Sequence, residues 1–374
     1  MRMAIDSRTL TLRPSGTSSY LTCAINEMSR QNPSWIFYLL VHKDLHPETI
    51  KLLGKRKNII IIKKPFFLFP KVGAIWHITK IYFILKTLKP DIFWAPGDPL
   101  PLWIPKKIRT IMTVHDFVPK KFKHTMAFNT RLVNNIFFDQ SIKKADILWA
   151  VSTYTEFEIR KYYPDRKRKN IFVGSGVNKS IFQKKNISLD EKHRLLAKLK
   201  INEKFLLFVG AQEPRKNLKF LLSLMPEISK LGYSLLIVGS KGWGKTDIAK
   251  VLNQEGYPRN KVVFSGFLST EELVNVFNIA SIYVSSSLNE GFGLPQLEAM
   301  NCGCPVVSSH NSGMIEVVEG AGETVKGWDK EDWLNAIRHV DLNRDHYIHR
   351  GFKRAQEYDW TLVIRNLTRH LETG

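Results

Sequence analysis

The chain has 374 residues, of which 44% are hydrophobic and 24% charged. This length exceeds one ordinary hydrophobic core, so we expect two domains, and the composition excludes a disordered or fibrous chain. The three cysteines, Cys23, Cys302 and Cys304, lack metal-type spacing, which argues against a disulfide framework or a zinc site. A reducing compartment therefore fits best.

The net charge is +22 and is unevenly distributed. Residues 1–180 hold 31 Lys and Arg against 12 Asp and Glu, whereas residues 181–374 hold 25 against 22. Such asymmetry predicts that the first half faces a polyanion, either an anionic lipid surface or nucleic acid. A lysine-rich surface that only keeps the protein in solution is the simpler alternative.

Neither an export signal nor a membrane span is evident. The first ten residues include Arg2, Asp6 and Arg8, where a signal would need an apolar core. The most apolar stretch, 72–88, is interrupted by one histidine and two lysines, and it falls short of a continuous span. We therefore expect a cytoplasmic protein that begins at Met1.

Apolar runs alternate with helix-like segments along the whole chain, a pattern typical of parallel sheets joined by crossover helices. The expected strands of the first half are 3–6, 35–41, 58–62, 91–95, 110–114, 146–152 and 171–173. Those of the second half are 205–209, 234–238, 262–265, 281–285 and 305–308. Most are apolar on both faces, as strands between two helix layers are. We predict an α/β fold with ligands at the carboxyl ends of the strands.

The domain limits follow from these runs. We expect a first domain over 1–180 and a second over 181–358, with a polar, basic linker at 178–188. The remaining segment, 359–374, reads as an amphipathic helix with apolar residues at Leu362, Ile364, Leu367 and Leu371. We expect this helix to pack back across the interface.

The most informative segment follows the expected strand 281–285 and reads Glu290-Gly-Phe-Gly-Leu-Pro-Gln-Leu-Glu298. A glycine loop precedes a helix whose first turn accommodates Pro295. The free N–H groups and positive dipole end of such a helix suit a diphosphate. Glu290 and Glu298 both reach one ligand there, with oxygens suited to sugar and ribose hydroxyls. Taken alone, each glutamate is better explained without a ligand: Glu290 as a charge that the helix dipole favours, and Glu298 as a solvated helix residue.

The run 290–307 resembles the E-x(7)-E signature of family 4 (group 1) glycosyltransferases, EGFGLPxLEAMxxGxPVV. Supporting segments stand in the expected order at 208–218, 236–243, 264–267 and 316–318, and more loosely at 5–6, at the Gly16 loop and at 114–116. Within that family the chain resembles bacterial transferases of mannosyl and rhamnosyl type that build surface polysaccharides.

The resemblance implies a GT-B architecture, in which two Rossmann-like domains with parallel sheets face a central cleft. The donor would lie on the second domain, the acceptor mainly on the first, and the anomeric configuration would be retained. Glu298 would bind the ribose, Glu290 the donor sugar, and Arg215 with Lys216 the diphosphate. The remaining donor-binding positions would be Gly291, Phe292, Gly293, Leu294, Gly210, Gly16 and Gly266.

One departure from the family concerns the strand end at Gly210. Many relatives carry an arginine directly after this glycine, whereas this chain has Ala211. The role of that arginine then either falls to Arg215 or is absent, and the assignment of Lys216 to the diphosphate is the more secure of the two. Fixed cations at this position stabilise the charge that builds on a departing diphosphate.

His115 follows the expected strand 110–114, at the carboxyl end where a catalytic cleft would lie. A lone histidine at such a position is commonly a structural hydrogen-bonding group, but the resemblance implies contact with the donor sugar. Its neighbour Asp116, expected on the acceptor side, would orient the ring or cap the following turn.

No aspartate pair with D-x-D spacing occurs in the chain. We therefore expect a metal-independent reaction without a cofactor, in which cations and helix dipoles act on a GDP-, UDP- or dTDP-linked hexose. A glycan or lipid-linked glycan would be the acceptor in cell-surface polysaccharide synthesis, on a protein peripheral to the inner face of the membrane.

Three alternatives compete with this interpretation. The segment 239–246 matches the P-loop pattern G-x(4)-G-K-[ST], which would indicate a nucleotide hydrolase, although no apolar strand ending in a Mg²⁺-binding aspartate follows it. A nucleotide-sugar epimerase has a similar architecture. A basic nucleic-acid-binding protein would explain the charge, but no recognisable module appears, so we expect no nucleic-acid partner.

Overall fold

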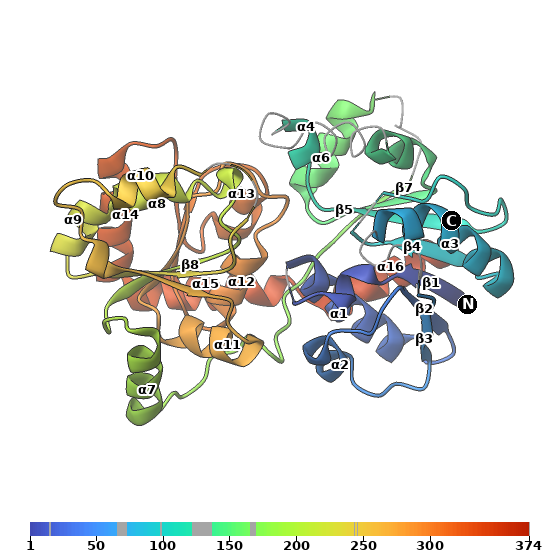
Figure 1. Ribbon diagram of the computed structural model, residues 1–374, viewed down its shortest axis with the longest axis horizontal. Coiled ribbons are helices and arrows are strands. Elements are labelled where there is room, and N and C mark those ends of the chain that lie inside the picture. Colours follow the sequence, from blue (N-terminus) through green and yellow to red (C-terminus); the bar gives the residue numbers. More distant parts are fainter. Residues whose placement is uncertain are drawn as a thin grey trace. The chain divides into compact units, whose positions relative to one another are not determined.

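The computed structural model describes residues 1–14, 16–65, 73–97, 99–121, 137–164, 170–242, 244 and 246–373, without the side chains of 73–79 and 119. The chain divides into two compact units. The first holds the described residues of Met1–Lys120 and Ala127–Gly176 together with the C-terminal helix, and the second holds Lys121 and Val177–Asp359 (Figure 1). The chain therefore ends in the unit where it began.

The first unit is built on a seven-stranded parallel sheet of order β3-β2-β1-β4-β5-β6-β7. Its strands are β1 (Arg2–Asp6), β2 (Ile36–Val41), β3 (Ile59–Lys63), β4 (Ile92–Ala95), β5 (Arg109–Val114), β6 (Ile147–Ala150) and β7 (Asn170–Val173). Its helical segments are η1 (Arg8–Thr11), α1 (Gly16–Gln31), α2 (Pro47–Leu53), α3 (Gly73–Leu88), α4 (Val118–Lys121), α6 (Thr153–Tyr162) and α16 (Trp360–Thr373).

The C-terminal helix α16 packs within the first unit. Its buried stripe consists of Trp360, Ile364, Leu367 and Leu371, and the Trp360 ring lies 5.0 Å from that of Tyr20 on α1. The expectation that Leu362 joins this stripe was wrong, because its side chain is 50% exposed. The stripe begins at Trp360, one helical turn before Ile364.

The second unit contains a six-stranded parallel sheet of order β10-β9-β8-β11-β12-β13. Its strands are β8 (Phe205–Val209), β9 (Ser234–Val238), β10 (Val262–Gly266), β11 (Ile282–Ser285), β12 (Val306–Ser309) and β13 (Glu323–Val325). Its helical segments are α7 (Leu189–Leu199), η4 (Pro214–Lys216), α8 (Leu218–Ser223), α9 (Met225–Lys230), α10 (Ile248–Leu252), η5 (Arg259–Lys261), α11 (Thr270–Ile279), α12 (Leu294–Asn301), α13 (Gly313–Val318), α14 (Lys330–Leu342) and α15 (Arg344–Glu357).

Local sequence explains where several of these elements begin. Ser188 and Ser269 form capping boxes with the glutamates three residues later, and these fix the starts of α7 and α11. Pro295 occupies the first turn of α12. Each of the twelve predicted strands is present, and the edge strand β13 was missed because two of its three residues are polar.

The strand order reverses direction at one place in each sheet, between β1 and β4 and between β8 and β11. Such topological switch points open a crevice at the carboxyl ends of the strands, where ligands of α/β proteins bind. The segments that follow β8 and β11 are therefore the expected ligand site of the second unit.

The most apolar stretch of the sequence, 72–88, forms α3, although Val72 lies outside the described residues. Its second half contributes Ile81, Ile84 and Leu85 to the core and leaves Phe83 63% exposed. Among the described residues, no helix combines the length and the apolar character that crossing a bilayer requires.

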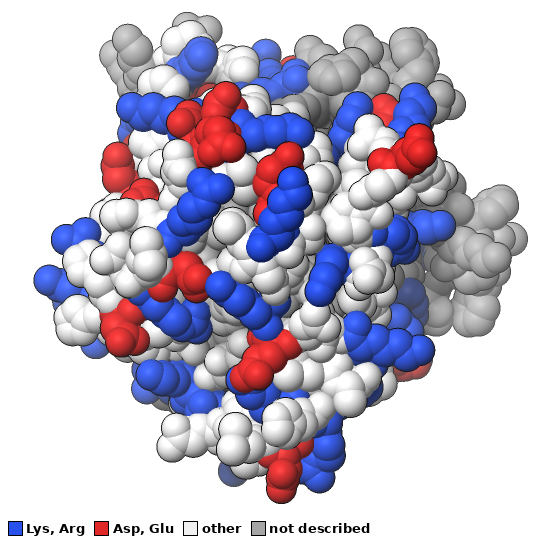
Figure 2. Space-filling model, turned by 90° about the vertical axis from the view of Figure 1, so that its left-hand side faces the viewer, with Lys and Arg blue, Asp and Glu red and all other residues white. Residues whose placement is uncertain are grey.

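Surface charge in the second unit is mixed. Lys and Arg side chains alternate with Asp and Glu over the face shown in Figure 2, as the near balance of charges in residues 181–374 requires. No single-sign field is visible on this face, and the sequence places most of the basic excess in residues 1–180.

Candidate active site

Two loops at the switch point of the second unit are tied together by hydrogen bonds. Leu288 N donates to Arg215 O at 2.7 Å, and Ser286 Oγ donates to Lys216 O at 3.1 Å. The segment after β11 is thereby fixed against η4, which follows β8. The charged side chains of η4 are held beside the glycine loop.

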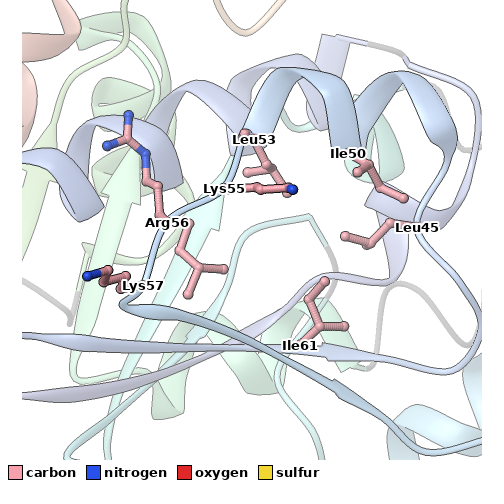
Figure 3. A pocket seen from close by; sticks show the side chains of 9 residues that line it. Leu45, Ile50, Leu53, Lys55, Arg56, Lys57 and Ile61 are labelled. Carbon is pink, nitrogen blue, oxygen red and sulfur yellow. The ribbon is translucent and has the colours of Figure 1, made fainter.

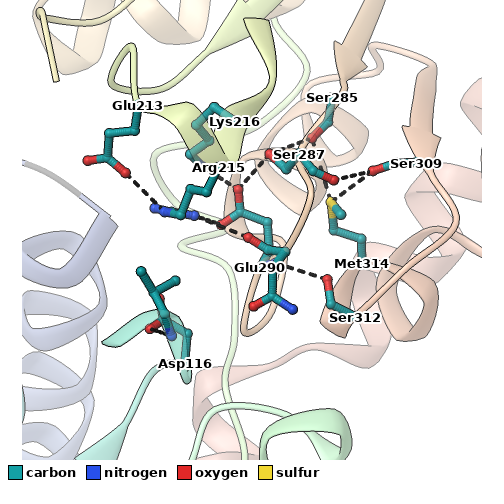
Figure 4. Close-up of polar contacts among 12 residues, drawn as sticks. Asp116, Glu213, Arg215, Lys216, Ser285, Ser287, Glu290, Ser309, Ser312 and Met314 are labelled. Carbon is teal, nitrogen blue, oxygen red and sulfur yellow. Dashed lines mark hydrogen bonds and ion pairs between the residues drawn. The ribbon is translucent and has the colours of Figure 1, made fainter. Parts of the chain in front are cut away.

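Glu290 is the centre of this arrangement (Figure 4). Its Oε2 accepts from Arg215 Nη1 at 2.7 Å, and its Oε1 accepts from Lys216 Nζ and from Ser287 Oγ, the latter at 2.7 Å. Its backbone N–H donates to Ser312 Oγ at 2.9 Å. The three charged side chains are each no more than 16% exposed, so this is a largely buried ion cluster.

The electrostatics of Glu290 follow from these partners. Burial by itself would raise the pKa of Glu290, but the charges of Arg215 and Lys216, with the hydrogen bonds from Lys216 and Ser287, lower it to about 2. Burial also lowers the pKa of Lys216, against the opposing pull of Glu290. Glu290 is therefore ionised at neutral pH.

Glu213 is a second carboxylate in the cluster, which the sequence interpretation missed. Its Oε2 accepts from Arg215 Nε at 2.9 Å. The two cations Arg215 and Lys216 thus face the two anions Glu213 and Glu290, and the four formal charges cancel. Any anionic ligand that bound here would share these cations with the carboxylates.

Glu298 lies on α12 and is 7% exposed. Its carboxyl group makes no hydrogen bond or ion pair with the part of the chain that the structure describes, and burial raises its pKa to about 8. A buried polar group without a partner is costly. Its oxygens are therefore available to the hydroxyl groups of a ligand.

The glycines of this unit allow close backbone approach at the strand ends. Gly239 lies so near Gly210 that an added Cβ would be 2.2 Å from the Gly210 oxygen, and Gly313 has the same relation to Gly291. Gly239 N donates to Gly266 O at 2.8 Å. Glycine is required at positions 239 and 313 because any side chain would meet backbone atoms.

The other predicted donor residues differ in role. Gly293 is the N-cap of α12, with a φ of +133°, and Leu294 is the first residue of this helix, so both lie at its N-terminus as expected. Phe292 is 7% exposed and packs on the Tyr358 ring at 5.3 Å. Its side chain is thus engaged in the core, and its backbone is the part left for a ligand.

In the first unit, His115 follows β5 as predicted, and its ring is hydrogen-bonded to the backbone just after the neighbouring strand β4. Its Nε2 lies 2.6 Å from Pro96 O, directly after β4, and Tyr20 packs edge-on to its ring at 5.0 Å. Burial lowers its pKa, with Pro96 and Asp116 opposing. Since the Pro96 carbonyl only accepts, Nε2 carries the proton and Nδ1 remains an acceptor in the neutral ring.

Asp116 and Gly16 lie on different segments of this unit, the first between β5 and α4 and the second on α1. Asp116 Oδ1 accepts from Val118 N at 3.0 Å, so the carboxylate caps the turn that begins α4. Gly16 is the first residue of α1, exposed and with open space around its Cα. The capping role predicted for Asp116 is thus confirmed, whereas the acceptor-side role of Asp116 and the donor-binding role of Gly16 stay predictions.

The P-loop match at 239–246 lies between β9 and α10, and its Trp243 and Lys245 fall outside the described residues. The helix that follows has only five residues and begins after Asp247, which adopts a left-handed conformation. Walker-type loops lead directly into a longer helix, so the context of this match differs from theirs. In the described ranges, no group of three or more His, Cys, Asp or Glu residues is placed to hold a metal ion.

Both halves of the chain match known protein families. Residues 16–180 match the family described as Glycosyltransferase Family 4, and residues 191–350 match Glycosyl transferases group 1. The chain belongs to the family 4, group 1 glycosyltransferases. Glu290, Glu298, Arg215 and Lys216 all lie within the group 1 match.

Several curated relatives are bacterial mannosyltransferases. The chain is 26% identical over 296 residues to the serotype-specific mannosyltransferase WbdA of Escherichia coli, which covers 75% of the chain and 35% of the relative. It is 29% identical over 241 residues to the O-antigen chain mannosyltransferase RfbU of Salmonella typhimurium, covering 64% and 62%. The chain thus spans less than two thirds of the length of these relatives.

Solved structures share the whole fold. The HepE protein of Anabaena, in complex with UDP and glucose, has a TM-score of 0.74 at 16% identity and covers 100% of this chain and 99% of its own. Sucrose-phosphate synthase of Thermosynechococcus elongatus has a TM-score of 0.76 at 19% identity, covering 99% and 98%. The fold of this family 4 glycosyltransferase is GT-B, as predicted.

Proposed function

We propose that the protein is a retaining, metal-independent glycosyltransferase that moves a hexose from a nucleotide sugar to a glycan or lipid-linked glycan. The observation that carries this proposal is the ion cluster at the switch point of the second unit, where Arg215 and Lys216 hold Glu290. Glu298, on the helix that follows, is buried and has no partner among the described residues. Mannosyltransferases among the relatives and a structural neighbour that holds UDP and glucose support the same reaction class.

The proposed roles follow from the chemistry of each group. Two unpartnered oxygens of Glu298 suit the hydroxyl pair of a ribose. The N–H groups at the start of α12 and the cations of Arg215 and Lys216 suit a diphosphate. These cations stabilise the leaving group as the bond from the anomeric carbon to the diphosphate oxygen breaks.

The remaining charges act on the sugar and the acceptor. Negative charge on Glu290 favours the positive charge that develops at the anomeric carbon. The acceptor oxygen forms the new bond on the same face of the sugar, its hydroxyl proton is released, and the nucleoside diphosphate departs with the bonding pair. His115 offers Nδ1 to a hydroxyl of the donor sugar in this proposal.

The acceptor is proposed to be carried by a lipid at the inner face of a membrane, where the protein is peripheral. The excess of basic residues in positions 1–180 supports this location because anionic lipids attract such a surface. Cell-surface polysaccharide synthesis is the process that fits both the location and the similarity to the O-antigen chain mannosyltransferase RfbU.

A donor screen tests the proposal. Purified protein is incubated with GDP-mannose, UDP-glucose or a dTDP-linked hexose, with and without a lipid-linked glycan, and the released nucleoside diphosphate is measured. We expect release with one donor that depends on the acceptor, and a product whose anomeric configuration matches the donor. Acceptor-independent conversion of the nucleotide sugar would indicate an epimerase, and hydrolysis of ATP with Mg²⁺ would indicate a P-loop enzyme.

A further inference from the structure

A groove opens between α2 and the edge strand β3 in the first unit (Figure 3). Its volume is about 470 Å³, and its lining includes Leu45, Leu53 and Ile61. The apolar side chains of the lining point into the same space, and Lys55, Arg56 and Lys57 stand on the segment that joins helix to strand. The groove is thus apolar inside and basic at its rim.

The apolar side chains of this region reach solvent. Ile50 is 53% exposed on α2, and Ile60 and Ile61 are 40% and 51% exposed on β3. Because β3 is the outermost strand of its sheet in the described part of the chain, Ile60 and Ile61 stand at a sheet edge, a position that proteins usually protect with charges or a covering element. An exposed apolar surface at an edge indicates an interaction site.

The charges around the groove have one sign. Residues 43–64 contain seven Lys and Arg against two Asp and Glu. Lys63 pairs with Asp44 at 2.7 Å, whereas Lys51, Lys55, Arg56 and Lys57 form no ion pair within the described residues. An apolar floor with unpaired cations at its rim complements a partner that is apolar inside and anionic at its surface.

We propose that this groove surface, formed by Leu45, Ile50, Leu53 to Lys57, Ile59 and Ile61, docks the protein on an anionic phospholipid leaflet. Phosphate groups bind the unpaired Lys and Arg side chains, and Ile50 and Ile61 contact the acyl region. A nucleic acid would use the cations but leaves the apolar floor uncovered. A second copy of the chain would bring two basic rims together, which like charges oppose.

This inference deepens the proposed membrane location and rests on it, but its test requires no donor or acceptor. Vesicle sedimentation compares neutral phosphatidylcholine with vesicles that contain 30% phosphatidylglycerol, at low and high salt. We expect binding only to the anionic vesicles and a fall with salt. Each basic residue near such a surface changes partitioning roughly fivefold, so Lys51→Gln, Lys55→Gln and Lys57→Gln together should lower binding on the order of a hundredfold.

Matched control variants distinguish the effect of contacts at the groove on vesicle binding from the effect of net charge. Lys230→Gln, Lys326→Gln and Lys353→Gln remove the same charge from exposed positions of the second unit, and we expect less than a threefold change. Ile50→Ser with Ile61→Ser should weaken binding to anionic vesicles at least tenfold, whereas Leu342→Ser, at an 85% exposed position, should not. Thermal unfolding of each variant confirms that it folds.

Several outcomes would overturn the proposal. Equal loss in the groove triple variant and the control triple variant would mean that only net charge matters. Unchanged vesicle binding together with loss of a dimer in analytical ultracentrifugation would assign the groove to contact between copies. Transfer to a water-soluble acceptor reports on the enzyme itself, so its retention in the groove variants distinguishes a failure of docking from a failure of the proposed function.

Discussion

Glu290, in the loop before α12, and Glu298, on α12, lie eight residues apart, yet at neutral pH the first carboxyl group is ionised and the second is mostly neutral. Both are buried, and the difference lies in their partners. Arg215 and Lys216 lower the pKa of Glu290 to about 2, whereas burial without a partner raises that of Glu298 to about 8. The site therefore offers a permanent negative charge at Glu290 and, at Glu298, a carboxyl group that can lose its proton when a ligand binds.

The first prediction concerns stability between pH 5 and 8. Burial raises the pKa of Glu298 from 4.5 to about 8 on folding, so the unfolded chain releases this proton first as pH rises. Below pH 4.5 Glu298 is protonated in both states and does not alter stability. Between pH 4.5 and pH 8 its titration lowers the free energy of unfolding by on the order of 4 kcal/mol. Glu298→Gln should remove this slope, as measured by denaturant unfolding of the ligand-free protein across that range.

Nucleotide binding gives an independent check of the same residue. A ribose diol binds best to the ionised carboxylate, so affinity for GDP or UDP should rise with pH up to about 8 in the native protein. The 2′,3′-dideoxy nucleotide and the Glu298→Gln variant should both lack this rise in titration calorimetry. A pH profile that is unaltered by the substitution would contradict the ribose assignment.

The second prediction concerns Glu290→Gln. The amide keeps the size of the side chain but leaves Arg215 and Lys216 with Glu213 as their one remaining anion in the cluster. We expect kcat to fall at least a hundredfold and stability to fall by about 3 kcal/mol, because a buried ion pair loses one partner. Stability due to Glu290 is fully present above pH 4.5 and is lost as pH falls through 2, so the variant should also show a weaker acid transition.

Glu213→Gln is the matched control for this cluster. It removes the same charge from Arg215 but leaves Lys216 paired with Glu290. With one anion fewer, the cations are easier for a diphosphate to reach, so nucleoside diphosphate affinity should increase while kcat changes less than in Glu290→Gln. Equal kcat losses in both variants would mean that Glu290 serves only to balance charge.

The third prediction compares lysines around the diphosphate. Lys216→Ala should reduce transition-state stabilisation by about 2 to 4 kcal/mol, as expected for loss of one donor to the leaving group. Lys219→Ala, on the adjacent helix with a 57% exposed side chain, should have little effect on kcat/KM. Lys245→Ala should also matter little, and an essential Lys245 with ATP hydrolysis would favour the P-loop interpretation instead.

The sequence predicted most of the fold because its strands are apolar on both faces and are separated by strong turn and cap signals. It also predicted the neighbourhood of Glu290 and Glu298, since a contiguous motif carries both. Glu213, Ser287 and Ser312 were missed because their roles depend on contacts between separate loops. Position 313 had a local signal in its glycine, but its close approach to Gly291 is visible only in three dimensions.

The last prediction is that transfer survives a strong chelator. The donor diphosphate carries negative charge that a metal ion neutralises in many enzymes, and here Arg215, Lys216 and the N-terminus of α12 are proposed to take that role. Activity with excess EDTA should therefore remain within a factor of two of the untreated enzyme, and added Mg²⁺ or Mn²⁺ should give no stimulation. The Lys216→Ala variant gives the more discriminating version of this test. If side-chain cations stabilise the leaving group, the variant should stay impaired, or recover only partly, when Mg²⁺ is added. Loss of activity in EDTA that Mn²⁺ restores in the native enzyme would assign the leaving-group charge to a metal ion and overturn the role given to Lys216.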